Sequence, residues 1–201
     1  MAAVTTPEHH STPYSNNKIA MWAFLGSECL FFGAFISSYL LYKNRGLPGQ
    51  GPFPKDLFDI PFTSATSFFL LVSSLSMVLA LNAIQRGDPQ KMRIWLVCTA
   101  TLGLLFVSCQ VFEFTEFGRE GMHLSSSVPA TAFFVLTGIH GVHVTIGVLM
   151  MLGLAGGSLV DERKGLRWTA LQSERVELFG LYWHFVDIVW IIIFTVVYLI
   201  R

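Results

Sequence analysis

The sequence predicts an all-α integral membrane protein, a bundle of five transmembrane helices, and three observations support this fold class. Hydrophobic residues make up 53% of the 201 residues and charged residues only 13%, about half the share that is usual in soluble domains. The mean hydropathy is +0.57. Five stretches are apolar over about 20 residues, the length at which a helix crosses a bilayer.

We expect one membrane domain over residues 18–201, preceded by a polar tail over residues 1–17. The tail lacks the basic start and the small-residue cleavage site of a secretory signal peptide. The five predicted spans cover about 19–42, 62–84, 94–113, 130–154 and 178–200. All three cysteines fall inside apolar stretches and form no CxxC pair, which favours buried thiols over disulfides.

The first two spans differ in their polar content. The first contains Glu28, which lies about 15 Å in from Lys18 at ~1.5 Å per residue and therefore close to the middle of the membrane. A loop rich in glycine and proline, residues 43–61, follows it. The second span is uncharged and contains several serines, at which helices can pack closely.

The third span ends in a polar pattern. Gln110, Glu113 and Glu116 are three residues apart and share one face of a helix. We expect a polar edge at the membrane interface, with a functional role for Glu113 as the alternative. Residues 118–128 are predicted to form a short loop.

The fourth and fifth spans contain the remaining intramembrane polar residues. His140 and His143 lie one turn apart in the fourth span, and residues 158–175 are predicted to form a charged loop after it. The fifth span has Glu177 at its entrance and His184 and Asp187 inside its apolar run, all on one stripe of a helix. A charge near the bilayer centre costs roughly 2.5–3.5 kcal/mol, so these residues need partners within the protein.

The charges predict an orientation but no polyanionic partner. The 13 basic residues equal the 13 acidic ones, so no net charge favours nucleic acid. The amino-terminal side of a five-span chain holds eight of the basic residues: Lys18, Arg86, Lys91, Arg93, Arg163, Lys164, Arg167 and Arg175. The opposite side holds five: Lys43, Arg45, Lys55, Arg119 and Arg201. Basic residues concentrate on the cytoplasmic side, so we expect the amino terminus in the cytoplasm and the carboxyl terminus outside.

Three interpretations fit the intramembrane polar residues. His140, His143, His184 and Asp187 could be the four ligands of a metal or haem site. The set could form a proton or ion path, or a group of interhelical hydrogen bonds that fixes helix packing. The expected depths favour packing over ligation, because His184 lies about 10 Å from the start of its span and His143 about 20 Å from the end of its own. Glu28 and Asp187 are expected at nearly equal depth.

Four motifs resemble those of subunit III of haem–copper terminal oxidases. They are Ser27-Glu28-Cys29-Leu30-Phe31-Phe32, Glu113-Phe114-Thr115-Glu116, His140-Gly141-Val142-His143-Val144 and Tyr182-Trp183-His184-Phe185-Val186-Asp187 with Glu177 seven residues before His184. They occur in the family's order, and the resemblance runs from about Lys18 to the carboxyl terminus. Five spans resemble the short bacterial form, since mitochondrial-length members have seven.

The resemblance implies a non-catalytic subunit of a bacterial respiratory oxidase, with cytochrome c oxidase expected first, that reduces oxygen to water and pumps protons. It implies a multi-pass protein of the bacterial plasma membrane that contacts subunit I directly, assembles with subunit II and other subunits, and supports stability and proton uptake. Haem and copper are expected in the partner subunits and no cofactor in this chain, with phospholipid as a candidate bound lipid. By analogy Glu28 would lie near subunit I, and His184 with Asp187 would belong to the packing network. The alternatives are subunit III of a quinol oxidase, the accessory protein of nitric oxide reductase, and a stand-alone membrane metalloenzyme.

Overall fold

A computed structural model describes residues 15–45, 59–165 and 170–200, with side chains from residue 173 onward in the last segment. These residues form α1 (Asn16–Tyr42), α3 (Ile60–Gln85), α4 (Pro89–Arg119), α5 (Val128–Arg163) and α6 (Ala170–Phe194), which continues into a π-helical turn, η1 (Thr195–Leu199). Within the described ranges, five helices are long and apolar enough to cross a membrane. The all-α, five-span fold class is therefore confirmed.

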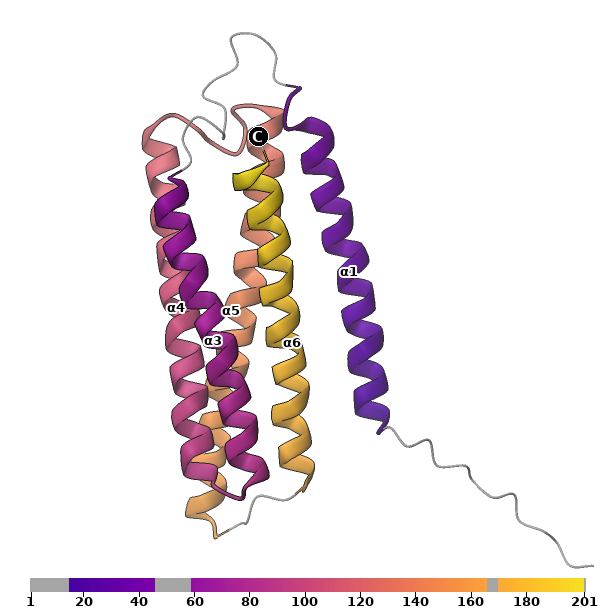
Figure 1. The fold of residues 1–201 in the computed structure, drawn as a ribbon, viewed down its shortest axis with the longest axis vertical. Coiled ribbons are helices and arrows are strands. Elements are labelled where there is room, and N and C mark those ends of the chain that lie inside the picture. Colours follow the sequence, from indigo (N-terminus) through magenta and orange to yellow (C-terminus); the bar gives the residue numbers. More distant parts are fainter. Residues whose placement is uncertain (1–14, 46–58, 166–169, 201) are drawn as a thin grey trace, which may run out of the picture.

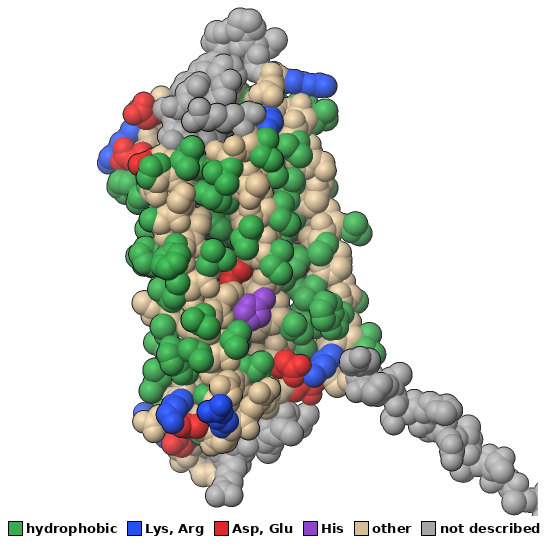
Figure 2. Space-filling view, viewed as in Figure 1, with side chains coloured by type: hydrophobic (Ala, Val, Ile, Leu, Met, Phe, Trp, Pro, Cys, Tyr) green, Lys and Arg blue, Asp and Glu red, His purple; other side chains and the backbone are tan. Residues whose placement is uncertain are grey.

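The helices run alternately up and down and form one bundle (Figure 1). Helix α3 packs on α4 and α6, and α5 packs on α4 and α6, so these four helices surround a common core. Helix α1 lies at the edge and packs against α5 and α6. Figure 2 shows hydrophobic side chains over the middle of one face, with charged side chains gathered toward its two ends. This is the pattern of a protein that spans a bilayer.

Capping residues set where the helices begin. Ser15, Asp59, Asp88 and Ser127 each accept a hydrogen bond from the backbone N–H three residues later. Proline occupies the first or second position of α3, α4 and α5, where its missing N–H costs nothing.

The helices extend beyond the apolar spans. The loop predicted over residues 158–175 is wrong in part, because α5 continues to Arg163 and α6 begins at Ala170. The apolar pattern marks only the membrane-spanning part of a helix, and residues with good helix propensity, such as Leu159, Glu162 and Arg163, allow α5 to continue beyond it. Helices α3, α4 and α5 are each followed by a glycine with positive φ, at Gly87, Gly121 and Gly165, which ends the helix.

Two tryptophans of α6 join it to α3. Trp183 is fully buried, and its indole N–H donates to Ser73 Oγ at 2.9 Å. Seven residues later, Trp190 donates to Ser67 Oγ at 2.8 Å. The Trp183 ring also fills the space beside Gly147 of α5 and Gly103 of α4. One side chain therefore contacts the three other helices of the core.

The cysteines do not follow the burial predicted for them. Cys29 is exposed, and Cys98 and Cys109 are half-buried. In a membrane bundle a residue inside an apolar stretch faces either the core or the lipid, and apolar composition alone does not separate the two.

Candidate functional site

The intramembrane polar residues do not gather at one point; they form contacts between different pairs of helices. Glu28 of α1 faces His143 of α5, with Glu28 Oε2 3.3 Å from His143 Nε2. Their side chains are 16% and 15% exposed, so both are largely removed from the lipid. Oε2 has no hydrogen-bond partner among the described residues, so the two side chains are in close polar contact without a hydrogen bond.

Hydrogen bonding assigns the two ring nitrogens of His143. Nδ1 lies 2.9 Å from the Ile139 carbonyl oxygen, which can only accept, so Nδ1 carries a hydrogen. In a neutral imidazole Nε2 is then the acceptor nitrogen, and this is the atom that faces the Glu28 carboxyl group.

His140 belongs to a different contact although it is only one turn away. It is fully buried, and its Nε2 lies 3.3 Å from the Val186 carbonyl oxygen of α6. Its ring packs against Trp190, with centroids 4.8 Å apart, and against Phe106. Nδ1 has no hydrogen-bond partner in the part of the chain that the structure describes. His140 thus links α5 to α6 inside the aromatic core.

His184 and Asp187 of α6 meet on one serine of α3. Ser74 Oγ donates to Asp187 Oδ2 and lies 3.0 Å from His184 Nδ1. Asp187 is 4% exposed and its Oδ1 has no hydrogen-bond partner among the described residues, whereas His184 is half-buried. We call Ser74, His184 and Asp187 the α3–α6 cluster. The sequence did not indicate that Ser74 contacts His184 and Asp187. Its only signal was that Ser74 is one of several serines in the second span, at which helices can pack closely.

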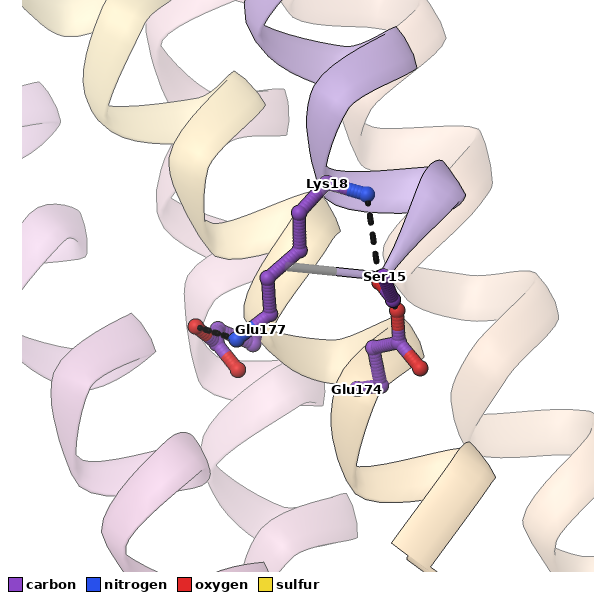
Figure 3. A network of polar contacts seen from close by, with 4 residues as sticks. All are labelled: Ser15, Lys18, Glu174 and Glu177. Carbon is purple, nitrogen blue, oxygen red and sulfur yellow. Dashed lines mark hydrogen bonds and ion pairs between the residues drawn. The ribbon is translucent and has the colours of Figure 1, made fainter. Parts of the chain in front are cut away.

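Glu177 shares the stripe of His184 and Asp187 but has another partner helix. Lys18 Nζ of α1 lies 2.7 Å from Glu177 Oε1, and Ser15, the capping residue before α1, donates to Glu174 of α6 (Figure 3). The Lys18 and Glu177 side chains are 30% and 37% exposed. This entrance cluster ties the start of α1 to α6 near the aqueous boundary.

Glu113 lies in a buried cluster near the other end of the bundle. Its Oε1 accepts from Thr63 of α3 at 3.0 Å, and its two oxygens lie 3.2 and 3.3 Å from the Tyr198 hydroxyl of η1. Glu113 is 8% exposed and Gln110 7%. The interfacial edge predicted from their spacing is therefore wrong for both, and only Glu116, which pairs with Arg119, fits it. Thr63 and Tyr198 carried no sequence signal, because their partner is distant in the chain.

The geometry gives the metal interpretation no common site. His140, His143 and His184 each contact a different partner. Within the described ranges no group of three or more His, Cys, Asp or Glu side chains is arranged to hold a metal ion. What these residues do in the described part of the chain is to bridge neighbouring helices.

Known proteins of one family match this sequence over nearly its whole length. The family model for cytochrome c oxidase subunit III matches residues 2–200. Quinol oxidase subunit 3 of Bacillus subtilis (strain 168) is 37% identical over 192 residues, which cover 96% of this chain and 91% of that protein. Cytochrome c oxidase subunit 3 of Bacillus sp. (strain PS3) is 36% identical over 194 residues, with 96% and 90% covered. Relatives of both types are equally similar, so identity does not separate the two electron donors.

Proposed function

The chain belongs to the cytochrome c oxidase subunit III family, and from this membership we propose that it serves as the third subunit of a haem–copper terminal oxidase. The family assignment confirms the resemblance seen in the four sequence motifs. The protein is a multi-pass membrane protein that works in a complex with other oxidase subunits. The observation that carries the proposal is the family match over nearly the whole chain.

The proposed role in the complex is structural and proton-related. The chain contacts subunit I, which carries the haem and copper, and supports its assembly and its proton uptake. The polar residues of this chain are engaged with neighbouring helices, which suits a subunit without redox centres. The Glu28–His143 pair is the site in this chain where a proton could be held close to subunit I. The electron donor is cytochrome c or, as the second candidate favoured by the Bacillus subtilis relative, a quinol.

The proposed orientation places the amino-terminal end of α1 on the cytoplasmic side. The turn between α3 and α4 and the end of α5 lie at the same end of the bundle (Figure 1), and most of the basic residues belong to this end. The entrance cluster would then face the cytoplasm, and the Glu113 cluster would lie in the outer half of the membrane.

The test is to tag this chain, extract it in mild detergent and record the reduced-minus-oxidised spectrum and metal content of what co-purifies. The partners are then removed and the isolated chain is measured again. Haem and copper that leave with the partners support the proposal. Metal retained in stoichiometric amount by the isolated chain would overturn it and favour the metalloenzyme alternative. Oxidation of reduced cytochrome c against quinol by the intact complex identifies the donor.

A further inference from the structure

The α3–α6 cluster lies at the middle of the membrane on an otherwise apolar surface. Asp187 is ten residues beyond Glu177, about 15 Å at ~1.5 Å per residue, so the cluster is near mid-depth. Exposed aliphatic side chains stand next to it along both helices: Leu71 (44%), Val78 (49%), Ile188 (56%) and Ile191 (45%). Figure 2 shows a histidine and an acidic side chain surrounded by hydrophobic ones in the middle of one face. We call these four residues and the cluster the α3–α6 face.

The hydrogen-bond pattern leaves one atom of His184 unused. Ser74 has a single hydroxyl hydrogen and gives it to Asp187, so the contact with His184 requires Nδ1 to be the donor. In a neutral imidazole the other nitrogen is then an acceptor. No residue that the structure describes donates to His184 Nε2, and His184 is half-buried at the surface of the bundle.

Lipid cannot supply the missing donor. Acyl chains have no hydrogen-bond donor, and the headgroups lie about 15 Å away along the helix axis. Polar groups inside a membrane face the protein interior or a protein partner, and helix association there depends on close packing and interhelical hydrogen bonds. A helix from another protein subunit satisfies both requirements.

We propose that the α3–α6 face binds a transmembrane helix of another oxidase subunit, which donates a hydrogen bond from a hydroxyl, amide or indole group to His184 Nε2. The inference rests on the proposed function, since it needs an oxidase complex to supply the helix. It assigns α3 and α6, and not the edge helix α1 alone, to the contact between subunits. The four aliphatic side chains supply the packing surface, and His184 fixes the depth at which the partner docks.

Two isosteric variants separate a bond to the partner from a bond within this chain. In His184→Asn the side-chain amide reaches the position of Nδ1 and keeps the contact with Ser74, but nothing occupies the Nε2 position. In His184→Gln an amide oxygen reaches the Nε2 position. The expected result is that Gln retains the partner subunits through detergent extraction while Asn weakens their association roughly 3- to 20-fold, the range of one interhelical hydrogen bond in a membrane. The reverse order, or no difference, would overturn the proposal.

Photo-crosslinking in the intact complex tests the same face without altering His184. A benzoyl-phenylalanine residue at Leu71 or Ile188 should crosslink to a transmembrane peptide of another oxidase subunit, identified by mass spectrometry. The same residue at Leu149 of α5, which is 64% exposed, measures the background from a surface outside this face. Crosslinks from Leu71 and Ile188 to lipid alone, or to a second copy of this chain, would overturn the inference. The proposed function would still stand in that case if haem and copper co-purify with the chain. If the proposed function itself is wrong, the wild-type chain will co-purify with no oxidase subunit.

Discussion

Replacement of Gly147 by alanine should destabilise the bundle by about 2–4 kcal/mol. A Cβ at Gly147 would lie 2.7 Å from both Cε3 and Cζ3 of Trp183, whereas carbon atoms that do not share a bond rest at about 3.5–4.0 Å. The indole has little room to move, because a Cβ at Gly103 would lie 2.6 Å from Cη2, so α4 packs closely against the adjacent edge of the same ring. Overpacking costs about 1–3 kcal/mol, and displacement of the ring also breaks the bond to Ser73, worth about 0.6 kcal/mol.

The assay is unfolding of the purified chain in mixed micelles, followed by loss of helical circular dichroism as denaturing detergent is added. Gly153→Ala is the matched control on the same helix, since a Cβ there meets no atom within 4 Å. It should leave stability unchanged or raise it by up to about 1 kcal/mol, because alanine favours a helix over glycine. If the free energies of unfolding of Gly147→Ala and Gly153→Ala differ by less than about 0.5 kcal/mol, Trp183 is not tightly packed between α4 and α5 and the reasoning is refuted.

Three further predictions concern single polar groups. Glu28→Gln should preserve assembly but slow turnover of the oxidase or shorten the time for which the oxidase stays active, because an amide fits beside His143 but does not take up a proton. Oxygen consumption over many turnovers measures both effects. A time course equal to that of wild type would remove Glu28 from the functional residues. Tyr198→Phe should lower stability by about 0.6–1.7 kcal/mol through loss of its hydroxyl contacts with Glu113, and equal unfolding profiles for variant and wild type would contradict this. The backbone N–H of Lys91, in the first turn of α4, donates to Asp88 and lowers the pKa of its carboxyl group below the ordinary 3.8. The ionised carboxylate therefore stabilises the folded state above pH 3.8. This stabilisation is lost as the pH falls through the pKa that Asp88 has in the folded state. Unfolding of wild type and Asp88→Asn between about pH 5 and 2.5 should therefore show the steeper acid loss in wild type, and parallel curves would contradict it.

Composition and periodicity were sufficient to predict the fold class. Five apolar stretches could be read directly, because a helix is the only unclosed structure that satisfies its own backbone in lipid. The helix ends could not be read the same way. Residues 158–163 are helical for local reasons of propensity and capping, and these do not depend on the apolar pattern that marks a span.

The sequence identified the polar residues of the candidate site but not their partners. His140 and His143 look equivalent in the chain, one turn apart, yet one contacts α6 and the other α1. Their rotation about the α5 axis differs by about 60°, because three residues at ~100° each fall that far short of a full turn. In a tightly packed bundle this difference is enough to select different neighbours. Glu113 shows the same limit, since its burial depends on η1, which lies 82 residues later in the chain at Thr195.

Helix α1 illustrates why polar contacts matter more than apolar area in this bundle. Its buried residues are Leu25, Phe32 and Tyr39, which repeat every seven positions. A strict seven-residue repeat forms a narrow apolar seam. The same seam would form again if the helix slid along its axis by seven residues, about 10.5 Å. Apolar packing of this kind therefore holds α1 against the bundle without defining its position.

The polar contacts of α1 remove that ambiguity. Lys18 pairs with α6, Glu28 faces α5, and Lys43 donates to a carbonyl of the last turn of the chain at 3.2 Å. These three residues are separated by 10 and 15 positions, neither of which is a multiple of seven. A slide by one repeat would keep the seam but break all three contacts at once, so only one register satisfies both. Glu28 thus helps to fix the position of α1 along its axis. Glu28→Gln should largely preserve this effect, and Glu28→Leu should not. A loss of turnover in the first variant with assembly intact would therefore separate proton holding from helix registration.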